Sequence, residues 1–185
     1  MLFTTLTTLL ATTSLVAAAP AAAPLEKRAC QIKYPTNLFS VIEASTQQNT
    51  GNNGYTFTGQ GAGKTNRYIT ELQFTNIPAG AYGCSVEYFF QKGWRVESTP
   101  DTRLDFFVPD RNISLADTWV NRPGRAYQVG TQIVRGSATE DVKLTAVTGA
   151  CAETLNYIIE VQGDKAGSVG FSQGNGNGLR LTYNC

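Results

Sequence analysis

Short runs in which apolar and polar residues alternate constrain the fold of this chain more than any other feature. A period of two places successive side chains on opposite faces of an extended strand, so each run predicts a strand with one buried face. No segment of about ten or more residues shows helical spacing, and β-branched and aromatic residues are frequent throughout. The chain is therefore expected to be all-β. The alternating runs are residues 38–44, 68–74, 84–90, 142–146, 155–161 and 179–183.

Turn-forming residues separate these runs, as in Ile77–Gly80, Arg122–Gly124 and Gly174–Gly178. Asn53–Gly54 suits a tight hairpin turn, because both residues tolerate positive φ. About eight to ten short strands with such spacing are typical of a sandwich or a barrel. We predict an antiparallel two-sheet β-sandwich, although the strand pattern alone also fits a closed barrel.

The first 28 residues are typical of a leader. Residues 1–18 are uncharged and rich in Leu, Thr and Ala, and they are too short and too Thr-rich for a membrane-spanning helix, which needs about 20 apolar residues. We expect a signal peptide that is cleaved after Ala18. Residues 19–28 are an Ala/Pro spacer ending in Lys27–Arg28, a dibasic pair that resembles the sites cut by fungal kexin-type proteases. The mature chain is thus predicted to begin at Ala29.

Residues 29–185 are close to the usual size of one domain, and we expect a single domain without an internal linker. Without the leader's Glu26, Lys27 and Arg28, this part carries 13 basic and 13 acidic residues out of totals of 15 and 14. A balanced surface offers no electrostatic footprint for nucleic acid or anionic membranes, so we expect neither as a partner. No later stretch has the length or hydrophobicity of a membrane span or a lipid-anchor signal. Secretion to the medium or the cell wall is the expected destination.

The mature part contains four cysteines, Cys30, Cys84, Cys151 and Cys185, and a secretory route favours disulfides between them. Metal binding by four thiolates is the alternative, but no pair has the C-x-x-C spacing of such sites. Cys84 lies on the apolar face of its predicted strand, whereas Cys30 and Cys185 bracket the domain. Among the three possible pairings we predict Cys84 with Cys151 and Cys30 with Cys185.

The absence of histidine from the chain excludes Ser-His-Asp and Cys-His catalysis and His-ligated metals. Residues 58–65 resemble a phosphate-binding loop, but Thr58 stands where the motif needs its first glycine. We interpret this segment as a flexible loop. The sequence therefore predicts no catalytic residue, no cofactor and no metal site.

Carboxylates gather between residues 97 and 117, and two of them held roughly 5 to 9.5 Å apart suffice for glycoside hydrolysis. Neighbouring arginines favour a solvated rim of ion pairs instead. Trp94 and Trp119 lie in or beside this region and would stack on sugar rings if exposed, although large aromatic side chains are more often buried. The carboxylates concerned are Glu97, Asp101, Asp105, Asp110 and Asp117.

Asn112 belongs to the only N-x-[ST] acceptor of the chain, Asn112-Ile-Ser114. It follows Pro109–Asp110, which indicates a loop, and loops of secreted proteins are where N-linked glycans are attached. We predict a glycan on Asn112.

Two stretches resemble a known fungal family. One is the predicted strand that ends at Ile77–Pro78, with Cys84 opening the next strand; the other is Gly149–Cys151, with a strand after it and Leu181–Cys185 at the end. This arrangement is similar to secreted fungal proteins of the But-two C-terminal domain-like family. The resemblance covers most of residues 30–185 and implies a shared fold and disulfide framework. The family name implies binding to the activating enzyme of a ubiquitin-like modifier inside the cell, which the leader of this chain argues against.

These features together predict a secreted, non-enzymatic extracellular or cell-wall-associated domain that acts by binding. Its expected partner is a cell-wall polysaccharide or an extracellular protein, and the domain is expected to be monomeric. A carbohydrate-binding module with Trp94 or Trp119 as the stacking platform is the more specific version. A secreted hydrolase that uses a pair of the carboxylates named above is the alternative from another class.

Overall fold

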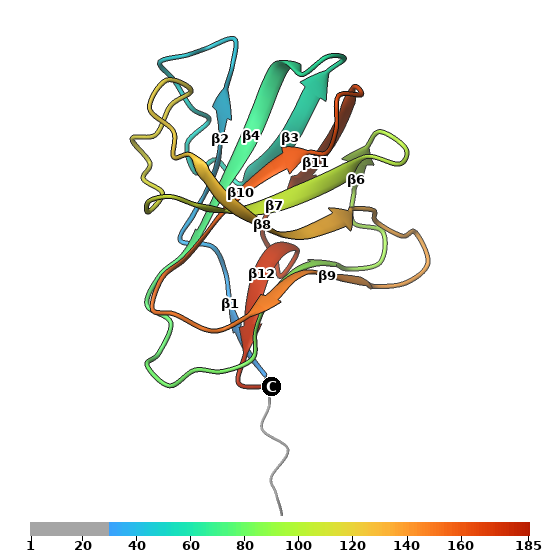
Figure 1. Cartoon of the computed structure of the whole chain (residues 1–185). Helices are drawn as coiled ribbons and strands as arrows, with labels where there is room; N and C mark the ends of the chain where they lie inside the picture. The colour runs from blue at the N-terminus through green and yellow to red at the C-terminus, as the bar shows by residue number, and fades with distance from the viewer. Residues whose placement is uncertain (1–29) are drawn as a thin grey trace, which may run out of the picture.

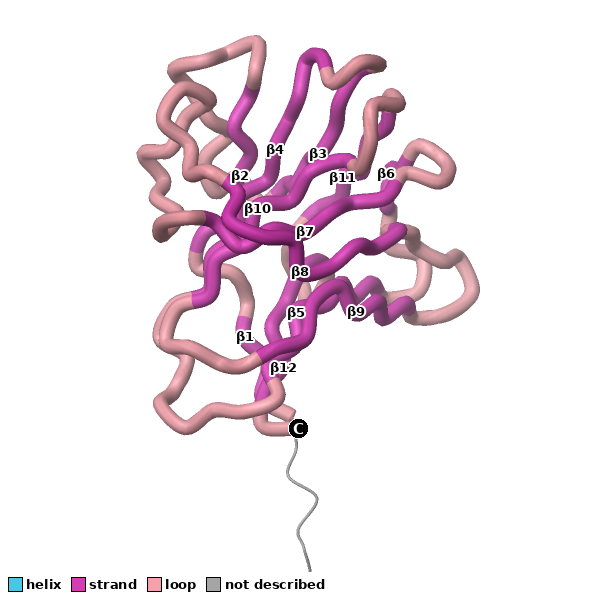
Figure 2. The backbone as a smooth tube through the Cα atoms, in the orientation of Figure 1, coloured by secondary structure: helices cyan, strands magenta, loops and turns pink. Residues whose placement is uncertain are grey.

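The structure, a computed structural model, describes residues 30–185, which form twelve β-strands in two antiparallel sheets and contain no helix (Figures 1 and 2). The predicted all-β fold with two sheets and two disulfides is confirmed. The predicted signal peptide, the spacer and Ala29 lie outside the described residues. Since this part of the chain is built of strands and loops, it offers no helix that could cross a membrane.

The smaller sheet has four strands in the order β1-β12-β5-β9 and brings the two ends of the described chain together. The alternation in residues 84–90 coincides with its central strand β5, and the last predicted run lies within β12. The strands are β1 (Gln31–Lys33), β12 (Gly178–Tyr183), β5 (Cys84–Phe90) and β9 (Val142–Gly149).

The larger sheet has eight strands, seven of them in the order β6-β11-β3-β4-β10-β7-β8, and β2 also pairs with β4. Twelve strands exceed the eight to ten that the sequence indicates, partly because β1 and β6 have only three residues each. The strands are β2 (Asn37–Ile42), β3 (Tyr55–Gly61), β4 (Thr65–Phe74), β6 (Val96–Ser98), β7 (Arg103–Pro109), β8 (Arg125–Ile133), β10 (Leu155–Val161) and β11 (Gly167–Ser172).

The main core lies between the two sheets and is built around aromatic side chains. Tyr88 and Phe90 of β5 meet Phe106 of β7 and Phe171 of β11, with ring centroids 5.2 Å to 6.1 Å apart. All four side chains are buried. Strand parity explains this arrangement, because each residue occupies the inward face of its strand.

A second, smaller core lies on the outer face of the larger sheet. The segment that joins β7 to β8, residues 110–124, folds back over this face beside β2 (Figure 1). Ile113 and Trp119 of this segment pack against Phe39, Ile69 and Ile158 of the sheet. The larger sheet is therefore buried on both faces where β2, β4 and β10 meet.

Two local predictions, a hairpin turn at Asn53–Gly54 and a flexible loop at residues 58–65, are wrong. Asn53–Gly54 does not close a tight hairpin, because β2 and β3 are not paired with each other and residues 43–54 form a long connection between them. The Asn53 side chain instead accepts a hydrogen bond from the backbone N–H of Tyr55 at 3.0 Å. Residues 58–65 are not a flexible loop but the end of β3, a turn and the start of β4.

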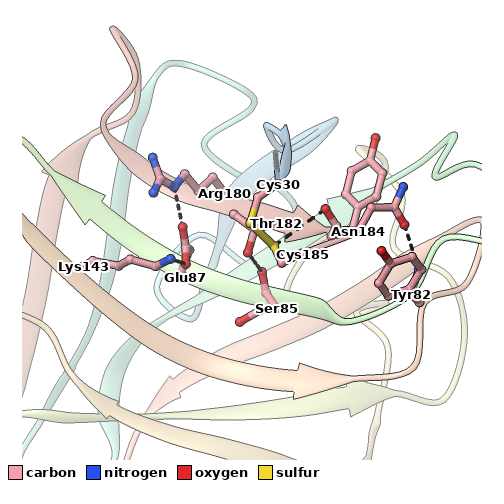
Figure 3. The surroundings of a disulfide bond; sticks show 10 residues. Cys30, Tyr82, Ser85, Glu87, Lys143, Arg180, Thr182, Asn184 and Cys185 are labelled. Carbon is pink, nitrogen blue, oxygen red and sulfur yellow. Dashed lines mark hydrogen bonds and ion pairs between the residues drawn. A yellow bond between two sulfur atoms is a disulfide. The ribbon is translucent and has the colours of Figure 1, made fainter. Parts of the chain in front are cut away.

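Both predicted disulfides are present. Cys84, buried at the start of β5, is bonded to Cys151, and their Cα atoms lie 5.1 Å apart. Cys30 and Cys185 are bonded with a Cα separation of 4.5 Å and join the chain before β1 to the chain after β12 (Figure 3). All four cysteines are thus paired within the described residues.

The outer face of the smaller sheet carries a buried carboxylate, Glu87, between two cationic side chains (Figure 3). Arg180, its direct cross-strand partner on β12, donates to Glu87 at 2.7 Å, and the Lys143 ammonium lies 2.9 Å from its other oxygen. The Arg180 guanidinium also covers the Phe89 ring at 4.0 Å. These contacts neutralise the buried charge and hold β5, β9 and β12 together.

Replacing Gly130 with Ala should destabilise the fold, because β8 and β9 approach one another closely at one edge of the two sheets. A Cβ atom at Gly130 would overlap the backbone carbonyl oxygen of Ala146 in β9. Backbone cannot move aside as a side-chain tip can, so we expect a loss of about 2–3 kcal/mol in the free energy of unfolding. The measurement is urea unfolding of Gly130→Ala and the wild type.

Gly149→Ala is the matched control for this substitution. Gly149 also lies in a strand, at the end of β9, but an added Cβ would meet no atom within 4 Å. Its unfolding midpoint should stay close to that of the wild type. Equal midpoints for the two glycine variants would contradict a close approach of β8 to β9.

Candidate functional site

The carboxylates that the sequence singles out between residues 97 and 117 do not form a catalytic pair. Glu97 is exposed on β6 and pairs with Arg95, whereas Asp101 and Asp110 line separate clefts. Asp110 accepts a hydrogen bond from the backbone N–H of Gly124 at 3.0 Å. Each of these carboxylates therefore has its own surroundings, and no groove unites them.

The two buried carboxylates of this set hold the structure together. Asp105 on β7 accepts hydrogen bonds at one oxygen from Gln128, Thr131 and Gln162, at 2.5 Å to 2.9 Å. Asp117 accepts two hydrogen bonds from the Arg111 guanidinium, at 2.8 Å and 3.1 Å. These partners occupy one oxygen of Asp105 and both oxygens of Asp117.

Both tryptophans are partly buried, and their rings already have contacts. Trp94 packs against the main core and donates its indole N–H to the carbonyl of Ser172 at 3.1 Å. Trp119 lies under two guanidinium groups, with the central carbon of Arg122 3.8 Å and that of Arg67 4.6 Å from a ring centroid. A sugar ring that stacked on Trp119 would have to compete with these cation–π contacts.

Trp119 marks a cleft of about 460 Å³ that we call the arginine cleft. Its floor is the outer face of the larger sheet, and its wall is the end of the segment that joins β7 to β8. Three arginines and two glutamates line it together with apolar residues. Its charged and aromatic lining residues are Arg67, Glu71, Trp119, Arg122, Arg125 and Glu160.

Glu71 of β4 lines this cleft, yet its side chain is fully buried, and neither carboxyl oxygen has a hydrogen-bond partner. Burial, followed by the nearby Asp117 carboxylate, raises the pKa of Glu71 to about 9. At neutral pH Glu71 is therefore protonated, and its carboxyl O–H faces Asp117, whose charge Arg111 neutralises. Glu71 is absent from the sequence prediction, because it lies on the polar face of its strand, where solvent is expected.

A second cleft lies where the β1–β2 connection meets the turn between β11 and β12. We call it the tyrosine pocket; it has a volume of about 270 Å³. Tyr34 and Tyr55 line it with 47% and 40% of their surface exposed. Thr56 lines it as well, and the buried Thr56 hydroxyl has no hydrogen-bond partner in the described protein.

The walls of the tyrosine pocket are held by side-chain hydrogen bonds. Gln173 accepts from the backbone N–H of Leu179 and donates to its carbonyl, both at 2.8 Å, and so holds the β11–β12 turn. Asn52 accepts from the backbone N–H of Leu38 at 2.7 Å. The side-chain amide of Asn175, exposed in this turn, has no hydrogen bond to any of residues 30–185. The pocket is therefore a fixed frame that presents free polar groups.

Asn112 lies in an exposed position at the start of the segment that joins β7 to β8. Its side-chain oxygen accepts a hydrogen bond from Asn156 at 2.9 Å, while its amide nitrogen bonds to no described residue. The nitrogen to which an N-linked glycan would be attached is thus free of hydrogen bonds to the described protein.

No group of three or more Cys, Asp or Glu side chains within residues 30–185 is arranged to hold a metal ion. Of the clefts described above, the arginine cleft and the tyrosine pocket are lined by residues with a buried polar atom that has no hydrogen-bond partner within residues 30–185. Comparison of the chain with models of known protein families and with curated proteins finds no match in either case.

Proposed function

We propose that this protein is a secreted, non-enzymatic domain that binds a neutral cell-wall polysaccharide through the tyrosine pocket. The observation that carries this proposal is the pairing of two half-exposed tyrosines with the unpartnered, buried hydroxyl of Thr56 in one small pocket. Two disulfides are consistent with an oxidising, extracellular location, which the leader also supports.

The chemistry of the pocket matches that of a sugar ring. Tyrosine rings contribute apolar area for the C–H faces of the sugar ring. The Tyr34 hydroxyl can exchange hydrogen bonds with its polar edge, whereas the Tyr55 hydroxyl donates to Glu97 at 3.4 Å and can accept from a sugar hydroxyl. Leaving the buried Thr56 hydroxyl unpartnered costs about 1–3 kcal/mol, which a ligand hydroxyl would recover if binding opened the pocket as far as this oxygen. The amide of Asn175 adds a donor and an acceptor at the rim.

The lining of the pocket supports binding without catalysis. It contains no Asp, Glu, Lys or Arg side chain, so it supplies neither the carboxylate pair of a glycosidase nor a charged acid–base group. The phenol of Tyr55 stays neutral, because burial and the neighbouring Glu97 raise its pKa above the ordinary value. A neutral lining favours an uncharged ligand over an acidic one.

Retention on insoluble polysaccharides tests this proposal. We expect the secreted protein to be retained on at least one of chitin, β-glucan, cellulose and mannan, with no sugar released into the supernatant. Tyr34→Ala and Tyr55→Ala should each weaken retention about tenfold or more. Tyr82→Ala is the matched control, because Tyr82 is also 47% exposed but lines none of the clefts described above. Release of sugar, or equal retention of all variants, would contradict the proposal.

Glycosylation of Asn112 belongs to the same proposal. A secreting eukaryotic host should attach a glycan there, because the side chain is exposed and its amide nitrogen is free. Digestion with an N-glycosidase should increase the electrophoretic mobility of the wild type and leave that of Asn112→Gln unchanged. A wild type whose mobility does not change on digestion would show that the acceptor is unused.

We also propose that the likeness to the But-two C-terminal domain-like family reflects a shared fold and disulfide framework. In support, Cys84 opens β5 soon after the turn at Ile77–Pro78, and it is bonded to Cys151 just before β10. The proposed function takes nothing from the intracellular role that the family name implies.

A further inference from the structure

We propose that the arginine cleft is a second binding site, for a sugar acid: a ring that carries one carboxylate and several hydroxyl groups. This site is independent of the tyrosine pocket, with which it shares no lining residue. Three properties of the cleft lead to this ligand, namely its charge, its unpartnered donor and its acceptors.

The cleft carries one uncompensated positive charge. Arg67 pairs with Glu43 at 3.4 Å, and Arg125 pairs with Glu160 at 3.2 Å. Arg122 has no carboxylate partner within residues 30–185, although burial and the neighbouring Arg67 disfavour its charge and lower its pKa. Glu71 does not supply the missing charge, because it is protonated at neutral pH. A ligand with a single negative charge would balance the cleft.

One guanidinium donor at the cleft lacks an acceptor. Nε of Arg67 is buried and has no partner, and Arg122 donates to the backbone carbonyl of Trp119. Both guanidinium groups lie over the Trp119 ring, which brings two like charges close together. A carboxylate bound beside them would accept hydrogen bonds and relieve this repulsion, and the planar fork of arginine suits carboxylate geometry.

The remaining lining distinguishes a sugar acid from a polyanion. Glu160 lines the cleft with 14% of its side chain exposed, so a free lone pair of its carboxylate is available to ligand hydroxyls. Arg122 supplies a single uncompensated charge, so a ligand with several charges, such as a phosphorylated or sulfated group, would leave further negative charge unbalanced beside Glu160. A volume of about 460 Å³ exceeds what a carboxylate alone would fill and lies within the range of small-molecule pockets.

Fluorescence titration tests the site directly. Trp119 is the only tryptophan left in the Trp94→Phe variant, since the chain has two. We expect glucuronate and galacturonate to change the Trp119 emission saturably, with an affinity that falls as salt is added. Glucose, which lacks the carboxylate, acetate, which lacks the ring, and inorganic phosphate should each bind about tenfold more weakly or worse.

Arg122→Gln, introduced into Trp94→Phe, should lose uronate binding by about tenfold or more. Arg95→Gln is the matched control, because Arg95 is exposed, pairs with Glu97 and does not line the arginine cleft. Circular dichroism of both variants checks that they are folded. If Arg122→Gln does not fold, the comparison of uronates, glucose, acetate and phosphate on the Trp94→Phe protein decides whether the site exists. Binding of acetate or phosphate as tight as that of uronate would overturn the proposal, as would unaltered uronate binding by folded Arg122→Gln. Retention on neutral polysaccharides should be the same with and without Arg122, so failure of this site is distinguishable from failure of the tyrosine pocket.

Discussion

Glu71→Gln should stabilise the protein at pH 8 and change its stability little at pH 5. The substitution keeps the size of the side chain and replaces a protonated carboxyl with a neutral amide beside Asp117. The substitution removes the free-energy cost of keeping the buried carboxyl protonated at a pH at which an exposed carboxyl is ionised.

The direction follows from the pKa values in the two states. Glu71 has an ordinary pKa of 4.5 in the unfolded chain and a pKa raised to about 9 in the folded protein. Between these values the folded state binds the extra proton, so wild-type stability falls as pH rises, by up to about 1.4 kcal/mol per pH unit. Below pH 4.5 both states are protonated, and above about pH 9 neither is, so the dependence ends there. Gln has no such dependence, and the advantage of the variant should reach on the order of 3–5 kcal/mol at pH 8.

Urea unfolding of both proteins at pH 5, 6, 7 and 8 measures this effect. Glu97→Gln is the control for loss of a carboxylate, because Glu97 is exposed on β6. Glu43 does not contribute to the pH dependence in this range. Its pKa is lowered, chiefly by the hydrogen bond that it accepts from the Arg67 backbone, so it is protonated only in more acidic solution. Parallel stability curves for Glu71→Gln and the wild type would show that Glu71 is ionised in the folded protein.

Removal of the Cys84–Cys151 disulfide should cost about 4 kcal/mol of the free energy of unfolding. The bond closes a loop with a sequence separation of 67 residues, and in the chain-entropy model such a loop stabilises by about 4 kcal/mol. Cys84 is also 4% exposed in the main core, so Cys84→Ala removes a packed sulfur atom as well. A typical domain is stable by about 5–15 kcal/mol, so this loss is a large fraction of the total.

The double variant Cys84→Ala/Cys151→Ala, compared with the wild type by urea unfolding under non-reducing conditions, measures this loss. Cys30→Ala/Cys185→Ala is the companion variant: it opens the outer loop, of sequence separation 155, but leaves the main core intact. A loss below about 1 kcal/mol for the Cys84/Cys151 variant would mean that the remaining bond and the core already restrain the chain.

Sequence pattern predicts those strands that are buried on one face. The alternation in residues 84–90 matches β5 to the residue, because one face of this strand meets the main core. Residues 155–161 match β10 as well, although Ile159 packs in the main core and Ile158 in the smaller core of the outer face. In β7, Phe106 enters the main core while its neighbour Phe107 packs in the smaller core of the outer face, so the alternation is lost. β8 is mostly exposed and therefore has no apolar face to detect.

The candidate sites could not be predicted from local pattern, since they depend on which distant segments meet. Glu71 occupies the polar face of β4, and only the folding of residues 110–124 over that face buries it. Trp119 was predicted as a binding residue and does line a cleft, but the sequence does not reveal that Arg67 and Arg122 cover its ring. Glu71 is singled out by the burial of all of residues 69–74, which the alternation of apolar and polar residues in this strand does not reveal.

The most direct test of carbohydrate binding by the tyrosine pocket is an NMR titration of the secreted, isotope-labelled protein. The soluble ligands are chito-, β-gluco-, cello- and manno-oligosaccharides, and backbone amide shifts report where each one binds. For at least one series we predict saturable shifts centred on Thr36, Gly54, Thr56 and Gly176 around the pocket, and their loss in Tyr34→Ala. Absence of shifts with all four series, or shifts centred elsewhere on the protein, would contradict the proposed site and the function assigned to it.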